Sequence, residues 1–202
     1  AAQDPGRRAN LLTLALGGPR ALPALRAAFA QDPTPDKAKA LCLLGDSEGV
    51  PLLAQHVKTL PMPVPEAYAW DGFLKVPELD GAAWCLAIPR DPRATEALLE
   101  RLASCDAATG FNTLRSLTGA LGRIGDPKAA PVLAAFLKKP GVQGHNNAGT
   151  DNAGTQASQF SKALVELFAA SALYRCGDYE GLGRTVLTRY LDDWRGVFVR
   201  YA

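Results

Sequence analysis

The sequence has few of the residues from which enzymes and metalloproteins build their sites. Among 202 residues it contains two histidines and four cysteines, and no Cys-x-x-C pair that would indicate a zinc site. His56 lies among polar residues and is expected on the surface of a helix, and His145 has no nearby serine or cysteine for a nucleophile–base pair. The sequence therefore predicts no catalytic constellation and no metal site.

A strong charge imbalance and a long apolar run are absent as well. Twenty-two basic and twenty acidic side chains give a net charge of +2, which is too small to indicate a nucleic-acid partner. No apolar run reaches the length of a membrane span, and no signal-peptide pattern is present, so a membrane is not an expected partner either. The compartment, cytoplasmic or exported, is left open. Because the chain begins at Ala1 without a methionine, it is interpreted as processed, as freed of a tag, or as excised from the C-terminal part of a longer protein.

The four cysteines are predicted to be buried free thiols. Cys42, Cys85 and Cys176 lie a few residues before a recurring turn, at positions expected to face the interior, and Cys105 stands apart from them. No spacing identifies a pair, so a disulfide is left open at this stage.

What the sequence does contain is an internal repeat centred on a Gly-Asp turn. Asp46, Asp91, Asp126 and Asp178 superpose when the chain is aligned on this turn, and Gly18 takes the same place near the N-terminus. A leucine stands five residues before each of these aspartates: Leu41, Leu86, Leu121 and Leu173. The pattern gives five copies, and self-similarity of this kind is typical of repeat architectures.

Each residue of the turn has a physical role. Gly45, Gly125 and Gly177 are able to adopt the left-handed conformation that ends a helix, and the aspartate after each is expected to cap amide groups of the next segment. In three copies a second proline follows five residues after the turn position: Pro23, Pro51 and Pro131. Since proline interrupts a helix that is already under way, we expect a short turn first and a long helix that starts near this proline.

Apolar residues recur at helical spacing, and no segment shows the alternation of a strand. Leu114, Leu117, Leu121 and Ile124, for example, share one helical face. Helices of about ten residues are marginal alone in water, so neighbouring helix pairs must stabilise them. We predict an all-α fold, an α-solenoid of about five antiparallel helix pairs. It forms one domain over residues 1–202, with two loop insertions at about 58–80 and 139–158.

The turn pattern G-D-P-x-A-x-P-x-L, which is complete at residues 125–133, resembles that of HEAT-like repeats. These are repeats of the short variety that is also found in phycobilin lyases. The resemblance covers about residues 7–190 and implies a stack of antiparallel helix pairs. A bilin-lyase-like repeat protein is one function that it implies.

The order of several segments resembles a second family, the C-terminal repeat region of bacterial FAD-dependent oxidoreductases of the xanthan-lyase-associated type. The segments are RRANLLTLALGGPRALPALRAAF, KAKALCLLGDSEGVPLLAQHV, KKPGVQGH and the stretch from ALYRCGD to the C-terminus. The flavin-binding signature of such enzymes is G-x-G-x-x-G, and no such sextet occurs here, so no FAD-contacting residue is carried over. The resemblance implies an accessory part of such an enzyme, with no cofactor in this chain and FAD in a parent protein.

The first insertion is a candidate binding segment, because insertions in a solenoid collect on one face. Tyr68, Trp70 and Phe73 follow alternate prolines that favour an extended path. These aromatic residues are interpreted either as a flap packed on the solenoid or as a contact surface for another domain or a saccharide-like ligand.

The second insertion is rich in glycine, asparagine and threonine, and is expected to be mobile unless a partner orders it. His145, Asn146 and Asp151, together with Asn147 and Asn152, offer nitrogen and oxygen atoms to a cation or a binding partner. Calcium loops place acidic ligands at alternate positions, and Asp151 is the only acid in this segment, which argues against a calcium site.

A repeat architecture without a catalytic constellation favours a non-catalytic module for protein interaction or domain docking. Binding would use the concave face and the two insertions. The expected partner is a protein or another domain of the same polypeptide, and nothing in the sequence indicates an oligomeric state. An accessory domain of a FAD-dependent oxidoreductase is the alternative.

Overall fold

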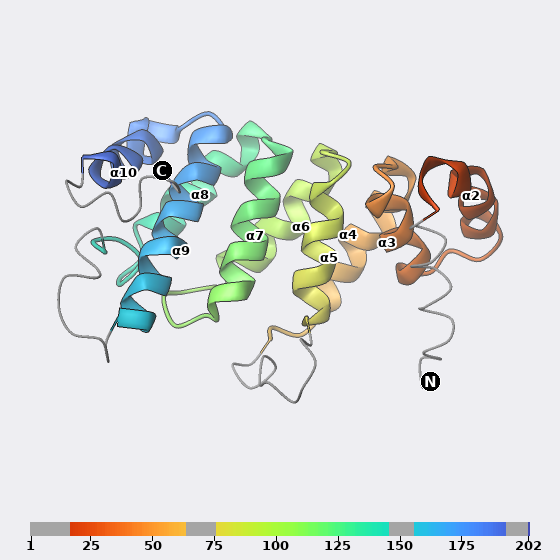
Figure 1. The fold of residues 1–202 in the computed structure, drawn as a ribbon, viewed down its shortest axis with the longest axis horizontal. Coiled ribbons are helices and arrows are strands. Elements are labelled where there is room, and N and C mark those ends of the chain that lie inside the picture. Colours follow the sequence, from red (N-terminus) through yellow and green to blue (C-terminus); the bar gives the residue numbers. More distant parts are fainter. Residues whose placement is uncertain (1–16, 64–75, 146–155, 193–201) are drawn as a thin grey trace.

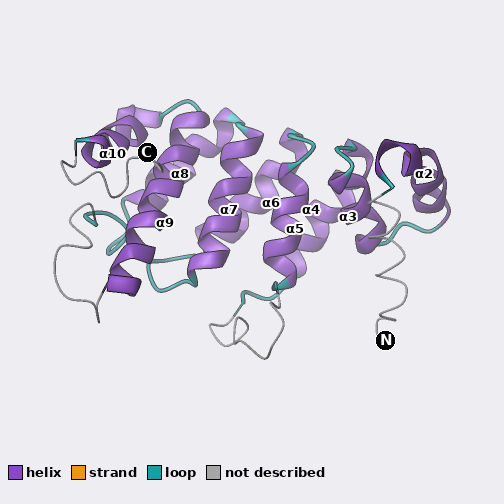
Figure 2. Cartoon of the chain, in the orientation of Figure 1, coloured by secondary structure: helices purple, strands orange, loops and turns teal. Residues whose placement is uncertain are grey.

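All regular structure in the computed structural model is helical within the residues that it describes, 17–63, 76–145, 156–192 and 202 (Figure 1). These ranges contain nine α-helices, and a short 3₁₀ helix precedes every second one, from α2 to α10; Figure 2 shows no strand among the described residues. The α-helices are α2 (Leu22–Gln31), α3 (Pro35–Leu43), α4 (Val50–Thr59), α5 (Glu78–Ala87), α6 (Thr95–Ala103), α7 (Phe111–Ile124), α8 (Ala130–Leu137), α9 (Gln156–Arg175) and α10 (Leu182–Leu191). The all-α prediction is confirmed.

The helices stand side by side in an array that runs from α2 to α10 (Figure 1). The first helices of successive pairs, α3, α5, α7 and α9, contact one another in that order, and so do the second helices α4, α6 and α8. The described residues hold four complete pairs, from α3/α4 to α9/α10, and α2 precedes them in contact with α3. The chain is therefore the predicted solenoid of helix pairs.

The turn before α8 has the predicted structure. Gly125 ends α7 with a φ of +73°, and the side chain of Asp126 accepts a hydrogen bond of 3.0 Å from the backbone N of Lys128. A 3₁₀ turn over Pro127–Ala129 follows, and α8 begins with Pro131 as its second residue. Proline lacks a backbone N–H group, and at this position in the first turn of a helix that group would have no partner within the helix.

Two further copies repeat this capping arrangement. Gly45 has a φ of +79°, and Asp46 accepts a hydrogen bond of 2.8 Å from the backbone N of Glu48. Asp91 accepts one of 2.9 Å from the backbone N of Arg93. Each aspartate satisfies an amide group that the helix itself leaves free, which confirms the predicted role of the turn.

Two copies depart from the pattern in part. Arg90 occupies the place of the turn glycine before Asp91 and has a φ of +55°. In the last copy Gly177 is left-handed as predicted, but Asp178 is left-handed too, with a φ of +51°. The Asp178 carboxylate therefore caps no adjacent amide and accepts a hydrogen bond of 3.1 Å from the backbone N of Arg184 instead. The predicted capping by Asp178 is thus present, but its acceptor reaches the first turn of α10 and not the 3₁₀ turn that directly follows it.

A continuous strip of small and branched apolar residues fills the space between the helices. The leucines five residues before each turn aspartate are fully buried: Leu41, Leu86, Leu121 and Leu173. Alanine and glycine let the first helices approach closely, since a Cβ added to Gly122 in α7 would lie 2.9 Å from the Cα of Ala172 in α9. Packing between neighbouring pairs thus supplies the stability that short helices lack on their own.

The insertions begin and end a few residues away from their predicted bounds. Since α4 continues to Thr59 and α5 begins at Glu78, the first insertion spans residues 60–77. The second spans residues 138–155, because α9 already begins at Gln156. Both insertions connect the end of one pair to the start of the next, at the helix ends opposite the Gly-Asp turns. None of the described helices has both the length and the apolar content that a bilayer-spanning helix requires.

Candidate binding surface

The first helices of the pairs, α3, α5, α7 and α9, form a row, and the solvent-facing side of this row, here called its outer side, carries a large exposed aromatic residue. Trp84 in α5 is 41% exposed, although its ring lies against the neighbouring helix α7. The close approach depends on Gly119, where an added Cβ would lie 3.3 Å from the Trp84 ring. Trp84 is therefore supported by α7 on one side and open to solvent on the other.

An aromatic pair bridges the next two helices of the row. Phe111 in α7 and Phe168 in α9 have ring centroids 6.3 Å apart. Arg115, one helical turn before Gly119, has its guanidinium carbon 6.0 Å from the centroid of the Phe168 ring, within the range of a cation–π contact. Aromatic side chains thus line the outer side of α5, α7 and α9 in succession.

Three exposed arginines on these helices form no ion pair within the described part of the chain. Arg115 and Arg123 belong to α7, and Arg175 ends α9. Helical spacing places Arg115 and Arg123 on the side of α7 that carries Gly119, and Arg175 on the side of α9 that carries Phe168. We refer to the following residues together as the arginine–aromatic face: Trp84, Arg115, Gly119, Arg123, Phe168 and Arg175.

The sequence around this face is cationic. Between residues 111 and 175 it contains seven lysines and arginines and three acids. One of the acids, Asp126, caps the turn before α8, and another, Glu166, is only 1% exposed. The charge of the arginine–aromatic face is therefore available to a partner.

The N-terminal part of the same row is neutralised internally. Glu78 at the start of α5 accepts hydrogen bonds from Lys39 Nζ at 2.8 Å and from His56 Nε2 at 3.1 Å. Partial burial opposes ionisation of Glu78, but the hydrogen bonds from Lys39 and His56 and the charges on them outweigh it and lower the pKa of Glu78 to about 2. His56 is thus part of a half-buried polar cluster, and the expectation that it lies on the open surface is wrong.

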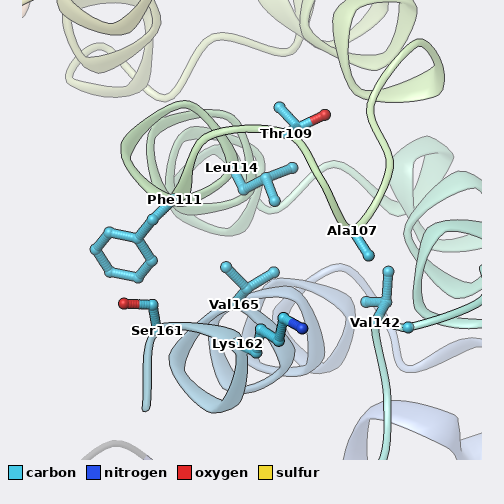
Figure 3. Close-up of a pocket in the computed structure, with 9 residues that line it drawn as sticks. Ala107, Thr109, Phe111, Leu114, Val142, Ser161, Lys162 and Val165 are labelled. Carbon is cyan, nitrogen blue, oxygen red and sulfur yellow. The ribbon is translucent and has the colours of Figure 1, made fainter. Parts of the chain in front are cut away.

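A cleft of about 160 Å³ has Phe111 in its lining (Figure 3). Its walls come from α7, α9 and the two loops that precede them. The lining residues are Ala107, Thr109, Phe111, Leu114, Gly141, Val142, Ser161, Lys162 and Val165. Figure 3 shows the side chains of Leu114, Val142 and Val165 around the space, with the Lys162 amine beside them. The cleft thus combines an apolar lining with a single positive charge.

The loop before α7 is held rigid by one acid. Asp106 Oδ1 accepts hydrogen bonds from the backbone N of Ala108 and Thr109, at 2.9 and 3.0 Å, and from Thr109 Oγ1 at 3.2 Å. The hydrogen bonds from these donors lower the pKa of Asp106, so the carboxylate stays ionised and accepts from the loop at neutral pH. Lys139 Nζ also donates to the carbonyl oxygens of Ala103 and Cys105, which ties this loop to the end of α8.

The loop before α9 is anchored on a buried carboxylate. Glu166 accepts hydrogen bonds from the backbone N of Gly144 at 3.2 Å, the backbone N of His145 at 2.9 Å and the hydroxyl of Tyr190 at 2.7 Å. Burial and the nearby carboxylate raise the pKa of Tyr190, which keeps its hydroxyl protonated as a donor. Sequence analysis missed this residue, although a single acid inside the apolar run ALVELF was a visible signal.

The residues that the sequence proposed for binding are only partly accounted for by the structure. His145 Nε2 lies 2.9 Å from the carbonyl oxygen of Gly141, so its ring contacts its own loop. Tyr68, Trp70, Phe73, Asn146 and Asp151 lie outside the described residues. Within the described ranges no three His, Cys, Asp or Glu side chains converge as metal ligands would.

The four cysteines are buried and free of disulfides, as predicted. Burial raises the pKa of Cys42 to about 12 and those of Cys85, Cys105 and Cys176 to about 11. Because the thiolate is the nucleophile and the metal ligand, these protonated thiols are suited to neither role at neutral pH.

A second, wider groove lies at the Gly-Asp end of α6 and has a volume of about 410 Å³. Its lining includes both charge signs, and most of these charges have partners inside the chain. Arg93 pairs with Asp91, Glu96 pairs with Lys58, and Asp126 caps its turn. The two cations and two anions in its lining balance, so this groove offers no net charge comparable with that of the arginine–aromatic face.

Comparison with known proteins identifies the repeat. Residues 114–139, which cover most of α7, the Gly125-Asp126 turn and α8, match the PBS lyase HEAT-like repeat family. This segment is a HEAT-like repeat. No curated protein and no solved structure matches the chain significantly, and the resemblance to FAD-dependent oxidoreductases gains no support from the comparisons. One unit of the solenoid is thus similar to a HEAT-like repeat, and the function has to be argued from the surface.

Proposed function

We propose that this protein is a non-catalytic HEAT-like repeat module that binds another protein, or another domain of its own polypeptide, through the arginine–aromatic face. The single observation that carries the proposal is the exposure of Trp84 beside arginines that form no ion pair in the described part of the chain. Tryptophan and arginine are enriched among the residues that dominate binding energy at protein interfaces.

The fold supports this use of the surface. Repeat solenoids present an extended face built from equivalent positions of successive units. On this face Trp84 comes from one pair, Arg115 and Arg123 from the next, and Phe168 and Arg175 from the last. A partner that lies across α5, α7 and α9 would contact all three at once.

Site-specific photo-crosslinking tests the proposal. A photoreactive phenylalanine analogue replaces Trp84, and in a matched control it replaces Gln55, which is exposed on the second-helix row. We expect an adduct of one discrete mass from position 84, and none from position 55, in cells that naturally make the protein. Arg115→Glu together with Arg175→Glu should abolish that adduct. The same adducts from both positions, or turnover of a substrate by the isolated chain, would contradict the proposal.

A second candidate is an accessory domain of a FAD-dependent oxidoreductase, in which these helices contact the cofactor domain. It is motivated by the order of the segments around KALCLLGDSEG and ALYRCGDYEG. The parent gene must then encode a strand followed by G-x-G-x-x-G upstream of this region. A complete gene without that signature would exclude this candidate.

A further inference from the structure

We propose that the cleft between α7 and α9 holds one apolar side chain of an acidic peptide segment, whose carboxylates contact Lys162 and Arg115. The inference rests on the proposed function and specifies the chemistry of the partner. The cleft contributes the pocket, and the arginine–aromatic face beside it contributes the positive charge.

The size and lining of the cleft suit one side chain. A cavity of about 150 Å³ lined by apolar side chains is large enough to take up a benzene ring, and this cleft has about 160 Å³. Phe111, Leu114, Val142 and Val165 supply apolar surface around it. A phenylalanine or leucine side chain would therefore fill the space and remove that surface from water.

Two cations without an ion-pair partner in the described chain lie near the cleft. Lys162 lines the cleft and is exposed, and Arg115 lies over the ring of Phe168, which pairs with the lining residue Phe111. Among the described residues, Asp106 and Glu166 each stand next in sequence to a lining residue, and both accept hydrogen bonds from backbone N–H groups of the adjoining loops. Carboxylates on either side of an anchoring side chain would therefore meet cations that no acid of the described chain neutralises.

The cleft is also preformed. The loop on one side is fixed by Asp106 and by Lys139, and the loop on the other side by Glu166 and Tyr190. A site that is ordered before binding loses less conformational entropy when the ligand arrives. The favourable burial of a single side chain can thus appear as measurable affinity.

Nucleic acid and anionic membranes fit the surface less well than a peptide. A nucleic-acid site needs a row of cations along the phosphate backbone, whereas this chain has a net charge of +2. A membrane would contact a broad apolar face, whereas the apolar surface here is a narrow cleft. A single apolar side chain of a peptide, flanked by carboxylates, would match both the width of the cleft and the positive charge beside it.

Peptide titration tests the proposal directly. The probe is a short fluorescein-labelled peptide of aspartate and glutamate with one central phenylalanine, and its binding is followed by fluorescence polarisation. Replacing that phenylalanine by alanine should raise Kd at least about tenfold, the loss expected for one buried aromatic side chain. Affinity should also fall with added salt, because charge pairs at a surface are screened.

Variants locate the site on the protein. Ala107→Leu fills the cleft from a surface loop and should raise Kd about tenfold or more. Lys162→Glu should raise it about fivefold at low salt. Lys128→Glu makes the same charge change at the opposite end of the helices and should leave Kd unchanged. Circular dichroism of each variant confirms that it is folded.

Three results would overturn the inference. One is equal affinity for the phenylalanine and alanine peptides. Another is an equal increase in the Kd of the peptide for the Lys128→Glu and Lys162→Glu variants. The third is binding of RNA or phosphatidylserine vesicles that Ala107→Leu weakens as much as it weakens the peptide. If the peptide fails but the adduct from position 84 persists, the partner chemistry is wrong and the interaction module remains.

Discussion

Gly125 and Arg90 occupy the same place in the repeat, and both have a positive φ, +73° and +55°. Glycine adopts this conformation freely, whereas a residue with a Cβ is strained by about 1–2 kcal/mol. The turn therefore requires a positive φ angle at this position, whichever residue occupies it. This explains why one copy of the repeat functions as a turn without the glycine that marks the others.

The first prediction concerns this position. Gly125→Val should lower the free energy of unfolding by about 1 kcal/mol or more through strain at positive φ. Arg90→Gly should raise it by up to about 1 kcal/mol, because it relieves the same strain. Urea unfolding followed by circular dichroism measures both. Equal stability of the wild type and Gly125→Val would contradict the cap assignment.

The second prediction concerns the buried carboxylate of Glu166. Tyr190→Phe removes one of its three donors and leaves its neighbours in place, so it should lower the free energy of unfolding by about 1–3 kcal/mol. Tyr174→Phe, at a 55% exposed position on α9, is the matched control and should have almost no effect. Similar effects of the two variants would show that the Glu166 network does not hold the end of the stack.

Single residues also show what sequence reasoning could and could not reach. Gly125 and Asp126 were predictable, because a turn is built from neighbours and its residue types are dictated by backbone geometry. The αL conformation of Asp178 was not, since it depends on how α10 meets α9. The cleft was not predictable either, because Ala107, Val142 and Val165 are far apart in the sequence and only the stacking brings them together.

At the scale of the element, helices α7 and α9 lie close enough that a methyl group decides between contact and clash. Gly122→Ala would place a Cβ 2.9 Å from the Ala172 Cα, and backbone atoms would have to move. We expect a loss of about 1–3 kcal/mol in the free energy of unfolding. Thermal unfolding of the purified variant gives the measurement.

Gly119→Ala is the matched control for this third prediction. Its Cβ would meet only the exposed ring of Trp84 at 3.3 Å, and alanine has a better helix propensity than glycine. The variant should be neutral, or more stable by up to about 1 kcal/mol. If Gly119→Ala is as damaging as Gly122→Ala, helix contact does not explain the glycine in α7.

The polar cluster that joins α3, α4 and α5 gives a fourth prediction, on pH. The pKa of Glu78 is lowered to about 2 in the folded chain, below its ordinary value of 4.5, so the unfolded state binds the proton more readily. The stabilisation is therefore complete above about pH 4.5 and is lost as the pH falls towards 2. Glu78→Gln should unfold at a lower temperature than the wild type at pH 6, and the difference should shrink towards pH 2.

Glu96→Gln serves as the control for the pH experiment. The Glu96 side chain is 81% exposed and pairs with Lys58 at the surface, where an ion pair contributes little. The thermal unfolding midpoint of Glu96→Gln should equal that of the wild type at every pH. A difference between Glu78→Gln and the wild type that stays constant from pH 6 to pH 2 would refute the role of the Glu78 charge.

At the scale of the whole molecule, each pair of helices is covered mainly by its neighbours in the row. Stability in such a stack is close to a sum of the units and the interfaces between them. The pairs in the middle have neighbours on both sides, whereas α2, the first described α-helix, packs mainly against α3 on one side. The overall fold was predictable for this reason: one repeating unit, once recognised, determines how the next one packs.

Native-state hydrogen exchange of the isolated chain, resolved by peptide, tests this claim most directly. The account predicts the slowest exchange in α5 and α7 and faster exchange towards α2 at one end and α10 at the other. Exchange at one common rate through α2, α7 and α10 would instead describe a single globular unit that opens all at once, and would contradict the stack of helix pairs.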